Sequence, residues 1–155
     1  MTECYSIWEP LPGIAFPCAG ISLSYHHKTD LQVLMHFSNV VNGPGQDLLL
    51  TFRGVIGFRW NPEDLGSVFY PVRRPLPKLT DPRWEDWTFP LLEVCDSKWL
   101  ATYKGFPSTE GRKHYYLIAM NDLVDILALP DVVATWQSPE EASVDSTSQV
   151  ASDYP

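Results

Sequence analysis

The sequence lacks several features that would assign the protein to a class. Its apolar runs are interrupted within a few residues, so no window approaches the roughly 20 apolar residues of a membrane-spanning helix. The N-terminal residues contain two acids and no basic region followed by an apolar stretch, so we expect no signal peptide and a cytoplasmic protein. The three cysteines fit neither a zinc ribbon nor a CxxC pair, and we expect reduced thiols.

Motifs of enzymatic chemistry are also missing. The chain has no GxGxxG, GxxxxGK[ST], HExxH or GxSxG pattern. A nucleophilic Cys95 with His114 as base is disfavoured, because the neighbours Glu93 and Asp96 are acidic and do not lower a thiol pKa. We therefore expect a non-enzymatic protein without cofactor or metal.

Positive charge is scarce. The net charge is −8, and residues 137–155 contain four acids and no base. The rest of the chain has 11 basic and 15 acidic residues. We expect one globular domain over residues 1–136 and an acidic, serine-rich, disordered tail over 137–155. The acidic body argues against nucleic-acid binding and suits a basic protein partner.

Strong period-two alternation is present in the first half of the chain. It predicts a hairpin of two strands over residues 21–26 and 31–38, followed by a long third strand over 48–60. Gly54 and Gly57 within the third strand indicate a bulge or the close approach of another backbone. The pattern is typical of an antiparallel sheet with one face on the core.

The second half mixes strands with a short helix. Four prolines in residues 71–82 predict an extended surface crossing, and residues 89–95 predict a short strand. Asp96 is a suitable N-cap for a helix of about two turns that Gly105 ends.

Residues 114–129 predict a strand, a turn and a second strand. A helix from Asp122 to Leu129 is the alternative, and residues 131–136 either extend the sheet or fold a last turn onto it. Together these patterns predict an α+β fold: a single domain with a mostly antiparallel sheet of about five to seven strands and one or two short helices.

Three of the four histidines fall within "SYHHKTDLQVLMHF", residues 24–37. In the predicted hairpin, adjacent His26 and His27 point to opposite faces, and His36 pairs near Ser22 or Gly20. This separates His26 from His36 by about 13–20 Å, too far for one metal ion.

Two surfaces are candidate binding sites. The first is "RWEDW", where two tryptophans flank two acids, although burial of both indoles in the core is the alternative. With the nearby acids of the 61–64 loop, this predicted partner site comprises Trp84, Glu85, Asp86, Trp87, Glu63 and Asp64.

The second candidate is the polar face of the predicted sheet, with His36, Arg53 and Arg59. It would form a groove for a small anion or a substrate. A solvated face, or one covered by the helix, is the alternative.

The segments "EVCDSKWLATYKGF" and "RKHYYLIAMNDLVDILAL" carry a family resemblance. A Val-x-x-Ser-x-Trp-Leu segment, a His-Tyr strand and an acidic turn before a Val/Ile-Leu-Ala run resemble a group of small bacterial proteins over about residues 48–129. Proteins of this kind are often immunity partners of polymorphic toxins. The resemblance implies an immunity-type inhibitor that masks a toxin domain, with no catalytic residues to carry over. An anion-binding or enzymatic domain and a structural subunit of a homo-oligomer are the alternatives.

Overall fold

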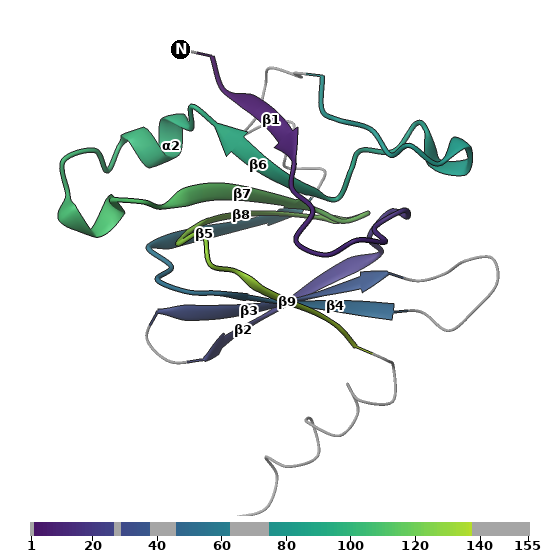
Figure 1. The fold of residues 1–155 in the computed structure, drawn as a ribbon, viewed down its shortest axis with the longest axis horizontal. Helices are drawn as coiled ribbons and strands as arrows, with labels where there is room; N and C mark the ends of the chain where they lie inside the picture. The colour runs from purple at the N-terminus through teal and green to yellow at the C-terminus, as the bar shows by residue number, and fades with distance from the viewer. Residues whose placement is uncertain (1, 27–28, 38–45, 63–74, 138–155) are drawn as a thin grey trace, which may run out of the picture.

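The computed structural model describes residues 2–26, 29–37, 46–62 and 75–137, which form two stacked antiparallel sheets (Figure 1). One sheet has the strand order β1-β6-β7-β8-β5 and the other β2-β3-β4-β9. The strands are β1 (Cys4–Ile7), β2 (Gly20–His26), β3 (Asp30–Phe37), β4 (Gln46–Phe52), β5 (Gly57–Pro62), β6 (Leu91–Cys95), β7 (Lys113–Ile118), β8 (Asp122–Ala128) and β9 (Val133–Gln137).

The predicted hairpin is confirmed as β2 and β3. Leu31 lies opposite Tyr25, which is one of the two registers that place both apolar rows on the same face. Along β3 every second side chain is buried, and the residues between them are partly exposed. The buried members of β3 and β4 supply one half of the core: Leu31, Val33, Met35, Phe37, Leu48, Leu50 and Phe52.

The predicted third strand over residues 48–60 is wrong in one respect, because the chain breaks it in two. β4 ends at Phe52 in one sheet and β5 begins at Gly57 in the other. Gly54 has a φ of 56°, and a Cβ at this position would lie 2.8 Å from Leu129 Cδ1. A Cβ on Gly57 would lie 3.0 Å from the Trp99 ring. The glycines therefore mark close approaches, as predicted, but the neighbours are side chains.

The predicted two-turn helix is shorter than expected. Helix α2 (Lys98–Ala101) has four residues, and its N-cap is Ser97. Asp96, the predicted cap, instead adopts a φ of 51° in the turn that leaves β6. The only other helical segments among the described residues are the 3-10 turns η1 (Pro82–Trp84) and η2 (Pro107–Thr109). The mostly antiparallel sheet is confirmed, but the nine strands form a two-layer sandwich, which is not the predicted α+β fold.

The C-terminal part of the core contains strands only. Residues 122–128 form β8, so the strand prediction holds against the helical alternative, and β9 extends the four-stranded sheet beside β4. Two connections between the sheets run side by side here. The Leu129 amide donates to the Arg53 carbonyl, and the Ile56 amide donates to the Leu127 carbonyl, both at 3.0 Å. The predicted tail, apart from Gln137, lies outside the described residues.

Aromatic rings close the space between the layers. Trp8, which follows β1, packs against Phe52 of β4 and Tyr115 of β7, with ring centroids 5.8 and 4.5 Å away. Burial raises the pKa of the Tyr115 phenol to about 12. The central strands β7 and β8 are buried on both faces, so the five-stranded sheet also has a covered outer side. None of the helices in the described residues is long and apolar enough to cross a bilayer.

The close approach of Leu129 to Gly54 predicts that Gly54→Ala strongly lowers the free energy of unfolding. The positive φ costs about 1–2 kcal/mol for an alanine, and the contact with Leu129 adds about 1–3 kcal/mol of overpacking. Gly111→Ala is the matched control, because Gly111 has a φ of 72° and nothing within 4 Å of its added Cβ. Urea unfolding should show Gly54→Ala to be the less stable variant. Equal free energies of unfolding would contradict the proposed steric contact.

The cysteines should differ sharply in reactivity. Burial raises the pKa of the Cys18 thiol to about 12, whereas Cys4 is exposed. Compared with the usual thiol pKa of 9.0, a pKa of about 12 lowers the thiolate fraction by roughly a thousandfold. Iodoacetamide at about pH 8 should therefore alkylate Cys4 in the native protein and Cys18 only after denaturation, as read by peptide mass spectrometry. Native labelling of Cys18 at the rate of Cys4 would contradict this burial.

Candidate functional site

The predicted "RWEDW" site is a loop around η1 in which the two tryptophans differ. The Trp84 ring packs against the core, and its buried Nε1 has no hydrogen-bond partner among the residues that the structure describes. Trp87 is 39% exposed, and Glu85 and Asp86 are exposed beside it. The core interpretation thus applies to Trp84 and the surface interpretation to Trp87. The predicted contacts in the 61–64 loop, Glu63 and Asp64, lie outside the described residues.

Polar contacts fix the conformation of this loop. The Asp81 carboxylate accepts the Arg83 amide at 2.9 Å and two guanidinium nitrogens at 3.1 and 2.8 Å. These bonds from Arg83 lower the pKa of Asp81 to about 2, so it is charged at neutral pH. On the other side of the loop, Lys78 Nζ donates to the Asp86 carbonyl at 2.9 Å. The Trp84 and Trp87 rings meet edge to face at 6.4 Å.

A small hollow of about 180 Å³ adjoins the exposed tryptophan. Trp87 and Asp86 line one side, and Met120, from the turn between β7 and β8, lines the other. Met120 is itself 44% exposed. The loop therefore presents an apolar depression with a carboxylate at its border.

The alternative ligand face does not assemble as predicted. His36 lies on the outer side of the four-stranded sheet, where Ser22 Oγ is 3.0 Å from its Nε2 and Asp47 is 3.1 Å from its Nδ1. Arg59 belongs to the other sheet and stacks on Trp99. Arg53 lies 3.6 Å from Asp131. The three residues were expected on one continuous sheet, and the break at Gly54 separates Arg59 from His36.

The histidine-rich hairpin has the predicted geometry. His26 pairs with Asp30 at one end of the β2–β3 ladder, and His36 pairs with Gly20 at the other. Within the described ranges, no three His, Cys, Asp or Glu side chains lie close enough to hold a metal ion.

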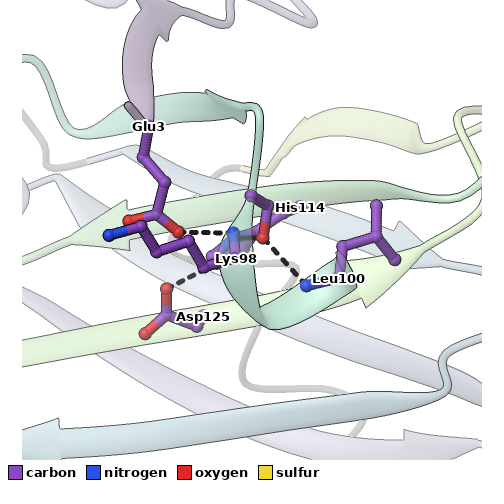
Figure 2. A network of polar contacts seen from close by, with 6 residues as sticks. Glu3, Lys98, Leu100, His114 and Asp125 are labelled. Atoms are coloured by element: carbon purple, nitrogen blue, oxygen red, sulfur yellow. Dashed lines mark hydrogen bonds and ion pairs between the residues drawn. The ribbon is translucent and has the colours of Figure 1, made fainter. Parts of the chain in front are cut away.

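Sequence reasoning missed a buried polar chain on the outer side of the five-stranded sheet. His114 of β7 and Asp125 of β8 are 4% and 1% exposed, and His114 Nε2 lies 2.6 Å from Asp125 Oδ1. On its other side, His114 Nδ1 lies 2.7 Å from Ser97 Oγ. Figure 2 shows His114 and Asp125 with the start of α2 above them. The sequence did contain a signal for this chain, because His114 and Asp125 each interrupt an otherwise apolar strand.

The donors and acceptors of this chain can all be assigned. Ser97 Oγ accepts the Leu100 amide at 3.0 Å as the N-cap of α2, so its proton is available for His114 Nδ1. An imidazole with a proton on Nε2 then donates to the Asp125 carboxylate. Every buried polar atom named here has a partner, which is the condition for burying such groups without a large penalty.

Ser–His–Asp chains also activate serine for acyl transfer, so a catalytic role is the alternative for these three residues. Here the serine contacts Nδ1 and the aspartate contacts Nε2, the reverse of the usual hydrolase arrangement. Ser97 is 7% exposed, and its oxygen already accepts the Leu100 amide. These features favour a structural role in which the chain attaches α2 to the sheet.

Further contacts hold α2 in place. The Trp99 ring meets the His114 ring edge to face at 5.4 Å, and the Arg59 guanidinium lies 3.8 Å from the centre of Trp99. At the start of the helix, the Glu3 carboxylate accepts the Lys98 amide at 2.7 Å, as drawn in Figure 2. The helix thus depends on β1, β5 and β7 for its position.

Comparisons with known proteins found no relative. No family model matches the chain, and neither a curated protein nor a solved structure matches it.

A structural role for Ser97 predicts that Ser97→Ala lowers the free energy of unfolding by about 1–3 kcal/mol. The variant loses the cap of α2 and leaves the buried His114 Nδ1 without its donor. Ser108→Ala is the control, because Ser108 is exposed on η2. We expect no adduct on Ser97 after treatment with a fluorophosphonate. A fluorophosphonate adduct at this residue, or unchanged stability of Ser97→Ala in urea, would contradict the structural role.

Proposed function

We propose that the protein is a non-enzymatic binding domain of the immunity type, acting in the cytoplasm, that masks a basic toxin domain. The observation that carries this proposal is the fixed loop around η1, which exposes Glu85, Asp86 and Trp87 together. The resemblance to immunity proteins over residues 48–129 supports the same role.

The loop is ordered before any partner arrives. A short two-stranded arrangement closes it, because the Leu79 amide donates to the Trp87 carbonyl at 2.9 Å and the Phe89 amide donates to the Pro77 carbonyl at 2.8 Å. The Trp84 ring anchors it to the core. A surface that is already ordered loses little conformational entropy on binding, so more of the contact energy contributes to affinity.

The chemistry of the exposed residues suits a basic partner. Tryptophan is enriched among the residues that dominate binding energy, and Trp87 stands at the border of the 180 Å³ hollow. A lysine or arginine of the partner could place its aliphatic stem against Trp87 and Met120 and its charge near Asp86. The net charge of −8 would attract a basic domain over a longer range and speed association.

The test is protection in living cells. The proposal requires a toxin domain encoded beside this gene, and that domain is co-expressed with the wild-type chain or with the triple variant Glu85→Ala, Asp86→Ala, Trp87→Ala. We expect the wild type to restore growth and the variant to fail, because the loss of an aromatic anchor and two charges should weaken binding by about a hundredfold or more. Trp84 is left unchanged because its ring belongs to the core.

The matched control is Arg53→Ala with Asp131→Ala, which alters an exposed ion pair elsewhere on the surface. It should protect as well as the wild type. Failure of the wild type to protect would contradict the immunity function itself. Protection by the triple variant at the wild-type level would instead remove only the assignment of the site.

A further inference from the structure

A second hollow, of about 630 Å³, differs from the first in charge, because basic residues form a large part of its lining. It is bordered by the end of β6, by α2 and by the segment that leads into β7. Its volume falls within the range of small-molecule sites, about 300–1,000 Å³. His114 and Ser97 also line it, so the buried polar chain forms part of its wall. The loop around η1 contributes none of its lining residues.

The wall of this hollow concentrates positive charge. Four of the eight lysines and arginines in the described residues line it, and only Glu93 and Asp96 oppose them. Glu93 is already paired with one of the four, since Lys113 Nζ lies 3.0 Å from its carboxylate. The lining therefore has a local excess of two positive charges in a chain whose net charge is −8. The four basic residues are Lys98, Lys104, Arg112 and Lys113.

Three of these basic side chains, those of Lys98, Lys104 and Arg112, have no acidic partner in the described part of the chain. The half-buried Arg112 donates its Nε to the Gly54 carbonyl at 2.9 Å, but no carboxylate lies within ion-pair distance of its guanidinium. The exposed Lys104 likewise makes no ion pair among the described residues. A partly buried guanidinium without a counter-charge is suited to binding a carboxylate or a phosphate, which match its planar donors.

The remaining lining is partly apolar, with Val94, Leu100 and Ala101. We propose that this hollow binds a small organic anion, with its carboxylate or phosphate group at Arg112 and Lys104 and a compact apolar body against α2. The proposal is independent of the masking function, because the two surfaces share no residues.

Binding is tested by titrating the full chain with phenyl phosphate, benzoate, benzamide and inorganic phosphate at constant ionic strength, followed by amide NMR shifts. We expect phenyl phosphate and benzoate to shift signals of residues 93–114 at millimolar concentration. Neutral benzamide should bind about tenfold more weakly, because it lacks the charge. Inorganic phosphate should bind more weakly than phenyl phosphate, because it lacks the apolar body.

The double variant Lys104→Gln, Arg112→Gln should weaken phenyl phosphate binding by about tenfold. Arg53→Gln with Arg83→Gln is the matched control, since it removes the same charge away from the hollow. If the first double variant does not fold, Lys104→Gln alone serves, because that side chain is exposed. Absence of shifts, equal affinity for benzamide, or an equal loss in the control pair would overturn the site. Equal affinity for inorganic phosphate would overturn the apolar part of the assignment.

Discussion

The contact between the His114 imidazole and the Asp125 carboxylate determines how the outer side of the five-stranded sheet is covered. His114 and Asp125 are only 4% and 1% exposed, so each needs a hydrogen-bond partner within the protein. The second imidazole nitrogen requires a hydroxyl, which Ser97 supplies as it caps α2. The position of the helix, and with it the hollow lined by basic residues, follows from this requirement.

The two proposed surfaces carry opposite charge on one small domain. Around η1, the acids are exposed and Asp81 is paired with Arg83, so the surface remains negative. Beside α2, bases outnumber acids, and within the described ranges Arg112 has only the Gly54 carbonyl as a polar partner. Such separation of charge lets a domain that is acidic overall attract a basic protein while retaining a local site for an anion.

The structural features that depend on local alternation of apolar and polar residues, such as the β2–β3 hairpin, could be predicted from the sequence. Alternation limited the β2–β3 register to two choices because only one face of that sheet is buried, and a shift of one residue would expose the whole row from Leu31 to Phe37. The break at Gly54 could not be predicted, since β4 and β5 both alternate and only the fold assigns them to different sheets. The Ser97–His114–Asp125 chain joins three separate segments, so no single window reveals it. The surface position of Trp87, but not of Trp84, depends likewise on tertiary packing.

The paired connections between the sheets have a mechanical consequence. Residues 53–56 lead from the four-stranded sheet to the other, and residues 129–132 lead back beside them. The Leu129–Arg53 and Ile56–Leu127 hydrogen bonds join the two paths. Sliding one layer over the other would stretch both connections and break both bonds at once. The sandwich should therefore respond to load as a single rigid body, with shear between its layers suppressed at this edge.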